Sequence, residues 1–96
     1  MLHIFDDFPI DTVTLEQTSS GDTILFTENA VYAAKKTETS FRSLQKAFSH
    51  LNFCVLKTDL IQRGVSFNDI QRNIPIIDED DYIDIKENSM AIKSWN

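Results

Sequence analysis

Cysteine, glycine and histidine are scarce in this sequence of 96 residues, and their scarcity excludes several kinds of site. The only cysteine is Cys54, so neither an internal disulfide nor a CxxC redox or zinc motif can form. Glycine occurs only at Gly21 and Gly64, which excludes a glycine-rich phosphate loop. The two histidines, His3 and His50, have no second ligand at metal-binding spacing. A small enzyme of the thioredoxin-like or phosphocarrier type is therefore disfavoured, and we expect no catalytic residue, cofactor or metal.

Positive charge is scarce as well, because 9 basic side chains face 15 acidic ones and the net charge is -6. Such a chain lacks the basic surface that neutralises phosphates, so we expect no direct binding to nucleic acid. No apolar run approaches the roughly 20 residues that span a bilayer, and no basic segment followed by an apolar stretch opens the chain. We therefore expect a cytoplasmic protein that makes no membrane contact.

Alternating strand and helix signals favour an α/β fold, a small parallel β-sheet flanked by helices, formed by a single domain over residues 1–96. Short apolar runs predict strands at Leu2–Phe5, Thr23–Phe26, Phe53–Leu56 and Ile74–Asp78. Helices are predicted over residues 11–20, after Thr27, over residues 40–51 and over residues 79–87. The helix after Thr27 is expected to bury Ala30, Val31 and Ala34, and that of residues 40–51 carries Phe41, Leu44, Ala47, Phe48 and Leu51 at spacings of three and four.

The segment Asn52–Gly64 predicts a complete strand-to-helix unit. Its apolar run lacks period-two alternation, which is typical of a strand covered on both faces. Thr58 is expected to cap the short helix that follows, with Asp59 at its positive end and Arg63 at its negative end. Gly64 can then adopt the left-handed conformation that ends a helix.

The C-terminal part of the sequence predicts an edge strand and a capped helix. Pro75 cannot donate to a strand ladder, so it belongs near a strand start or on an edge. Asp78 is expected to cap the following helix, and Tyr82 and Ile85 to point inward. The acidic residues 78–81 also fit a metal site or an acid/base pair, but a helix start explains them better. The last residues, Met90, Ile92 and Trp95 among them, are expected to dock on this chain or on another.

Several segments together resemble the TusB proteins of the DsrH-like family. They are MLHIF at the start, SGDTILFTENAVYAA at residues 20–34, VLKTDLIQRG at residues 55–64, IPIIDEDDYIDI at residues 74–85, and Trp95. The most specific features are Gly21-Asp22 before an apolar strand and the spacing of Asp59-Leu60 with Arg63-Gly64. Their order and spacing cover nearly the whole chain.

The resemblance implies a fold of the DsrE/DsrF/DsrH type and a place in a sulfur-relay complex. Partners would be TusC-like and TusD-like paralogues, two copies of each subunit in a heterohexamer. Such a complex serves 2-thiolation of the wobble uridine of tRNA, and its sulfur-carrying cysteine belongs to TusD. The resemblance therefore implies a non-catalytic subunit that is needed for the complex.

The candidate chemical residues have simpler structural explanations. Cys54 lies in an apolar strand, so we expect a buried thiol and not a persulfide carrier. Some DsrH members have a cysteine nearer the N-terminus, which this sequence lacks. His3 is expected to be a hydrogen-bonded core histidine, and His50 to end a helix. Residues 27–29 follow the second strand at the edge where open α/β sheets bind ligands, but helix capping explains them as well.

A domain of this size cannot hide all of its large apolar side chains, so some should meet a partner. We predict that Phe67 and Trp95 lie at or beside a subunit interface.

Two other functions remain open at this level. A DsrH-type subunit of a DsrEFH complex in dissimilatory sulfur oxidation belongs to the same family, and gene neighbourhood would distinguish it. A stand-alone homodimeric binding module would remain apart from the two paralogues on co-expression.

Overall fold

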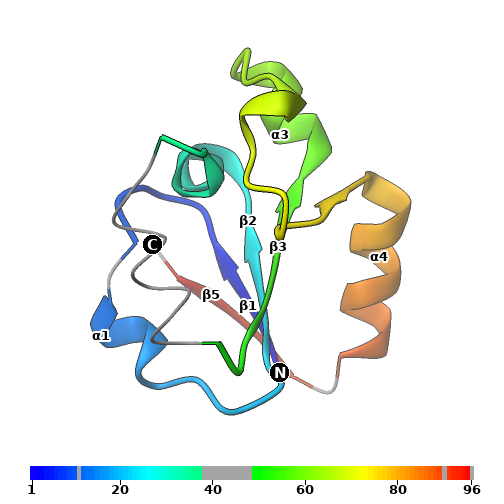
Figure 1. Cartoon of the computed structure of the whole chain (residues 1–96). Coiled ribbons are helices and arrows are strands. Elements are labelled where there is room, and N and C mark those ends of the chain that lie inside the picture. Colours follow the sequence, from blue (N-terminus) through cyan, green and yellow to red (C-terminus); the bar gives the residue numbers. More distant parts are fainter. Residues whose placement is uncertain (11, 38–48, 90, 96) are drawn as a thin grey trace.

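One five-stranded parallel sheet organises the chain, with the strand order β4-β3-β2-β1-β5 (Figure 1). The computed structural model describes residues 1–10, 12–37, 49–89 and 91–95. The strands are β1 (Leu2–Phe5), β2 (Thr23–Phe26), β3 (Asn52–Leu56), β4 (Ile76–Ile77) and β5 (Ile92–Trp95). The predicted small parallel sheet flanked by helices is therefore confirmed.

The two edge strands depart most from the prediction. The strand expected over residues 74–78 is only two residues long. Its start is lost because the Ile74 N–H bonds the carbonyl of Gln71 and Pro75 has no N–H. At the other edge, the C-terminal residues form β5, which pairs with β1 from Leu2↔Ile92 to Phe5↔Trp95. The tail thus docks on this chain as a fifth strand.

The helical elements lie in the connections between strands. They are α1 (Thr12–Leu15), η1 (Glu28–Ala34), α3 (Lys57–Gln62), η2 (Phe67–Asp69) and α4 (Glu79–Asn88), of which η1 and η2 are 3-10 helices. The helix predicted over residues 40–51 falls mainly on residues 38–48, which lie outside the described residues; Leu51 is described and is buried.

The helix predicted over residues 11–20 was too long, because α1 ends at Leu15. Thr18 bonds the carbonyl of Leu15 through both its N–H and its hydroxyl, at 3.1 and 2.6 Å. The Ser19 N–H donates to the carboxylate of Asp22 instead of to a helix carbonyl. These local bonds compete with helix continuation, and only Leu15 supplies a buried apolar position since Val13 is exposed.

Thr27 is the N-cap residue of η1, as predicted, but its hydroxyl makes no capping bond, and the predicted cap at Thr58 is wrong. Both hydroxyls bond other elements. Thr27 Oγ1 donates to the carbonyl of Phe5, and Thr58 Oγ1 donates to the carboxylate of Glu79. Thr58 lies inside α3, whose N-cap residue is Leu56 and has no side-chain cap. The two threonines therefore join neighbouring elements to each other.

Other predicted helix ends are confirmed. Asp78 caps α4 in a capping box, since its carboxylate accepts from the Asp81 N–H at 2.9 Å and Asp81 accepts in return from the Asp78 N–H. Gly64 follows α3 with φ at 68°, in the left-handed region that favours glycine. Acidic residues in the first turn of α4 thus have the structural role that the sequence indicated.

The pleat of the sheet sends alternate side chains to two different cores. On the face that α4 covers, Tyr82 and Ile85 pack on a cluster made of Leu2, Leu25, Cys54 and Leu56 (Figure 1). On the other face lies a larger cluster to which α1, η1 and α3 contribute; it includes Phe5, Leu15, Ile24, Phe26, Ala30, Val31, Ala34, Val55 and Leu60. The inward stripe of α4 and the buried face of the helix after Thr27 are both confirmed.

Candidate functional site

The thiol of Cys54 lies inside the sheet, beneath α4. The residue is 6% exposed, and its Sγ lies 3.7 Å from the carbonyl oxygen of Ile24, to which it can donate. Burial away from water disfavours the thiolate and raises the pKa of Cys54 from 9.0 to about 12. The prediction of a buried thiol is confirmed, so Cys54 remains a protonated thiol near neutral pH.

His3 is buried and has hydrogen-bond partners at both ring nitrogens. Its Nε2 lies 2.9 Å from Oδ2 of Asp22, and its Nδ1 lies 3.1 Å from Nε1 of Trp95. Because the indole N–H can only donate, Nδ1 accepts and Nε2 carries the proton that is donated to Asp22. The interpretation of His3 as a hydrogen-bonded core histidine is confirmed.

Asp22 is the polar centre of this network, and sequence reasoning assigned it no role. Its carboxylate accepts from the Ser19 N–H, from His3 and from the α-amino group of Met1. The Ser19 bond first and then the His3 bond lower the pKa of Asp22 from 3.8 to about 2. The pair Gly21-Asp22 was the signal in the sequence, but only the fold brings Asp22 to His3.

We expect Asp22→Asn to lower stability mainly at neutral pH. Because folding lowers the pKa of this carboxyl, its contribution is present above about pH 4 and is lost as the pH falls towards 2, and its size is about 2 kcal/mol. Urea unfolding of the wild type and of Asp22→Asn at pH 7 and at pH 2.5 measures this contribution. The difference between their free energies of unfolding should be smaller at pH 2.5. Glu16→Gln is the matched control, because that exposed carboxylate has no hydrogen bond to lose in the described part of the chain. An equal difference in the free energy of unfolding at both pH values would contradict stabilisation by the ionised carboxylate of Asp22.

Hydrogen bonds that involve charged side chains link η1 to α3 beside the carboxyl end of β2. The N–H of Glu28, whose φ is 48°, donates to Oδ2 of Asp59 at 2.8 Å. Arg63 donates from Nε to Oδ1 of Asn29 and lies 3.7 Å from the carboxylate of Asp59. Asp59 lies in the first turn of α3 and Arg63 is its C-cap residue, as predicted, and the same two side chains also join α3 to η1.

An acidic hollow of about 440 Å³ lies beside this link and is lined by Asp6, Asp7, Glu28 and Asn29. It occupies the edge where open α/β sheets bind ligands. Among the described residues, no group of three or more His, Cys, Asp or Glu side chains has the arrangement to hold a metal ion. The hollow therefore gives no sign of a metal centre.

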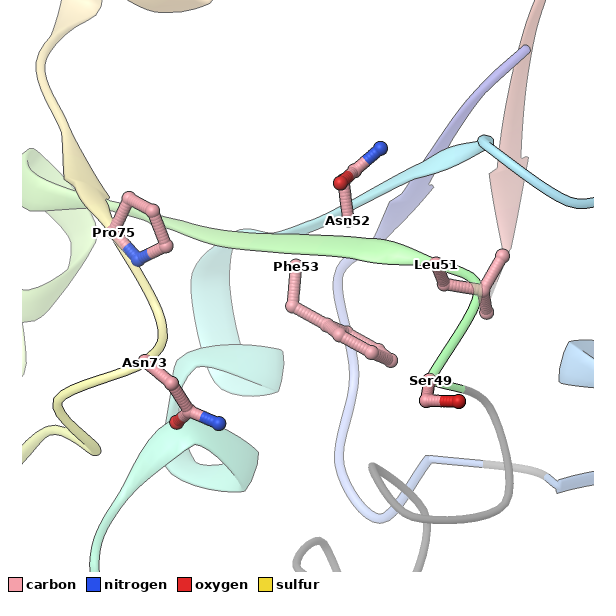
Figure 2. A pocket seen from close by; sticks show the side chains of 6 residues that line it. All are labelled: Ser49, Leu51, Asn52, Phe53, Asn73 and Pro75. Carbon is pink, nitrogen blue, oxygen red and sulfur yellow. The ribbon is translucent and has the colours of Figure 1, made fainter.

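Two further hollows meet near β4. One of about 370 Å³ is lined by Ser49, Leu51, Asn52, Phe53, Asn73 and Pro75. Figure 2 shows that Phe53 leaves β3 on the side of Ser49 and Asn73, whereas Asn52 points to the opposite side. The second, the basic hollow, has about 410 Å³ and is lined by Lys36, Phe67, Asn68, Ile70, Gln71, Arg72, Ile74, Pro75 and Ile76. Pro75 borders both, so the two hollows adjoin.

The two predicted interface residues lie at opposite edges of the sheet. Phe67 is 41% exposed and lines the basic hollow beside β4, with the Lys57 ammonium 5.7 Å from the centre of its ring. Trp95 is half-buried on β5, where it stacks on His3 and Phe5. The fold does not bring the two side chains together, so they mark separate surfaces, and the interface role of each stays a prediction.

Comparison with known proteins identifies the family. The family model described as DsrH like protein matches residues 10–91. This chain belongs to the DsrH-like family. Membership indicates a subunit related to sulfur relay, and no curated protein matches the DsrH-like chain.

Solved structures support the fold of this DsrH-like chain. A protein of unknown function from Methanobacterium thermoautotrophicum, MTH1491, is similar with a TM-score of 0.71 and 9% identity, over 98% of this chain and 96% of that one. Protein Tm0979 from Thermotoga maritima is similar with a TM-score of 0.64 and 21% identity, over 93% of this chain and 94% of that one. In the described part of the DsrH-like chain, no helix has the length and apolar character that crossing a membrane requires.

Proposed function

We propose that this chain is a non-catalytic subunit of the TusB type in a cytoplasmic sulfur-relay complex. Its partners are TusC-like and TusD-like paralogues, two copies of each subunit, and the complex serves 2-thiolation of the wobble uridine of tRNA. Membership of the DsrH-like family over residues 10–91 supports the sulfur-relay setting. The segments that resemble TusB support the narrower assignment.

The state of Cys54 carries the proposal of a non-catalytic role. A persulfide carrier must present a reactive sulfur to another protein, which requires an accessible thiolate. The only thiol of this chain is 6% exposed and has a pKa raised to about 12. The sulfur is therefore carried by a partner, and this subunit contributes surfaces, of which Phe67 and Trp95 are the first candidates.

Co-expression with TusC-like and TusD-like paralogues tests the assembly. We expect the three chains to co-purify with equal stoichiometry and a mass that fits two copies of each. The measurement is multi-angle light scattering after size exclusion, followed by quantification of each subunit. A chain that elutes apart from both paralogues would refute the assembly and favour a stand-alone module.

Replacing Cys54 tests whether a partner, and not this chain, carries the sulfur. Cells that carry Cys54→Ser in place of the natural chain are expected to keep the wild-type content of 2-thiouridine in tRNA, measured by mass spectrometry of nucleosides. Cys54→Ala is a second variant that places no hydroxyl in the apolar cluster. Removing the sulfur-carrying cysteine of the TusD-like partner is the positive control and should abolish thiolation. Loss of thiolation by both Cys54 variants with the assembly intact would refute the non-catalytic role.

A DsrH-type subunit of a DsrEFH complex in sulfur oxidation shares the same family. The tRNA measurement separates the two, because a sulfur-oxidation subunit would leave thiolation unchanged when the whole chain is deleted.

A further inference from the structure

His3 on β1 holds the edge strand β5 by a hydrogen bond that depends on the protonation state of its ring. Nδ1 of the neutral imidazole accepts from Nε1 of Trp95 at 3.1 Å, while Nε2 donates to Oδ2 of Asp22 at 2.9 Å. A second proton on the ring must therefore go to Nδ1, the atom that accepts the indole N–H. Two N–H donors would then face each other, so the bond between His3 and Trp95 exists only while the imidazole is neutral.

Strand β5 depends on Trp95 because little else of the strand is buried. Of its four residues only Trp95 is half-buried, and the other three are exposed. The Trp95 ring stacks on His3 and Phe5, with ring centres 6.2 and 6.4 Å apart. The strand lies at the edge of the sheet and pairs only with β1. Displacement of Trp95 would therefore leave β5 held mainly by its backbone ladder to β1.

Charged groups next to His3 act on this second proton in both directions. The carboxylate of Asp22 favours it, because a negative charge stabilises an imidazolium. The pKa of Asp22 is lowered to about 2, so this carboxylate stays ionised in mild acid. The α-amino group of Met1, which lies 3.0 Å from the same carboxylate, opposes the second proton. Helix α1, which packs on this face of the sheet through Leu15, has no charged residue.

Lys93 makes the contact between β5 and a charged imidazole unfavourable. It pairs with His3 in register, so both side chains leave the same face of the sheet. Its ammonium lies 4.2 Å from the centre of the Trp95 ring, on which His3 also stacks. An imidazolium would therefore share one indole ring with an ammonium, and the two like charges repel each other.

We propose that His3 is a pH-sensitive switch that releases β5 from the sheet when its imidazole becomes charged. Histidine is the side chain that most readily changes charge between about pH 5 and 8. Because the ring is 2% exposed, a proton from water reaches Nδ1 only as Trp95 moves aside, so proton uptake and strand release occur together. The docked strand needs the neutral ring, so higher pH favours docking and lower pH favours release. The switch belongs to the isolated chain and does not depend on the proposed sulfur-relay role.

NMR of the isolated chain between about pH 7.5 and about pH 5 tests the switch. Trp95 is the only tryptophan, so its Nε1–H gives a single indole signal. We expect a hydrogen-bonded position for this signal at the higher pH, and a move towards the position of free indole with the same midpoint as the ring signals of His3. The amide protection factors of β5, corrected for the intrinsic pH dependence of exchange, should fall about tenfold or more, whereas those of β2 and β3 should change little.

Two variants distinguish the switch from a general effect of acid. His3→Gln keeps one donor and one acceptor but cannot take up a proton, so its β5 should stay protected across the range. His50→Gln is the matched control, because it removes the other histidine, in the turn before β3, and should leave the release and its midpoint unchanged.

Three results would overturn the proposal. The first is that the ring of His3 stays neutral across the range. The second is that it becomes charged while the Trp95 signal and the protection of β5 stay unchanged. The third is that His3→Gln loses protection of β5 at the lower pH as the wild type does. If His3→Gln does not fold, the agreement or disagreement of the His3 and Trp95 midpoints in the wild type decides alone.

Discussion

The thiol of Cys54 is expected to react with iodoacetamide about a thousandfold more slowly in the folded chain than in the unfolded chain at pH 8. The nucleophile is the thiolate, and a rise of the pKa from 9.0 to about 12 lowers its population by about that factor. Tyr82 and Ile85 of α4 pack on the cluster that contains Cys54, so they also block access of the reagent to the sulfur. Reaction in the folded state then requires the chain to open.

Alkylation followed by mass spectrometry measures both rates, with urea supplying the unfolded reference. The matched control is Ser20→Cys in a Cys54→Ala background, which places the sole thiol on an exposed turn and should react at an ordinary rate. Comparable rates for native and unfolded wild type would show that the sulfur is accessible. That result would also remove the observation on which the non-catalytic role depends.

Trp95→Ala is expected to lower the free energy of unfolding by about 3 kcal/mol. The substitution removes the ring that stacks on Phe5 and His3 and leaves Nδ1 of the buried His3 without its donor. The lost contacts are those that hold β5, an edge strand that pairs only with β1, on the sheet. Urea unfolding followed by far-ultraviolet circular dichroism is the measurement, because the variant lacks the only tryptophan.

Two variants separate the contributions to this loss. Trp95→Phe keeps an aromatic ring but loses the N–H, so it should cost about 1–2 kcal/mol. Ile92→Ala is the control on the same strand, and its 44% exposed side chain should matter little. If Trp95→Ala were no more costly than Ile92→Ala, Trp95 would have no part in the fold and would be left with the predicted interface role alone.

The site residues show where sequence reasoning failed. Thr27 and Thr58 are of a residue type that often caps helices, and a cap is predicted from the local sequence alone. In the fold, the carbonyl of Phe5 and the carboxylate of Glu79 lie within reach of these hydroxyls and bind them instead. Asp59 likewise has a local partner in Arg63 but also accepts the Glu28 N–H from another element.

The sequence by itself determined the local features, namely the three strands β1, β2 and β3, the left-handed Gly64, the cap at Asp78 and the burial of Cys54. Each depends on residue type and periodicity within a few neighbours, which a sequence displays directly. Only the tertiary structure decided that the tail becomes β5, that Asp22 and Trp95 meet at His3, and that Phe67 and Trp95 lie at opposite edges. These depend on which strands are neighbours in a parallel sheet, and strand order brings together residues as far apart as His3 and Trp95 without leaving a local signal.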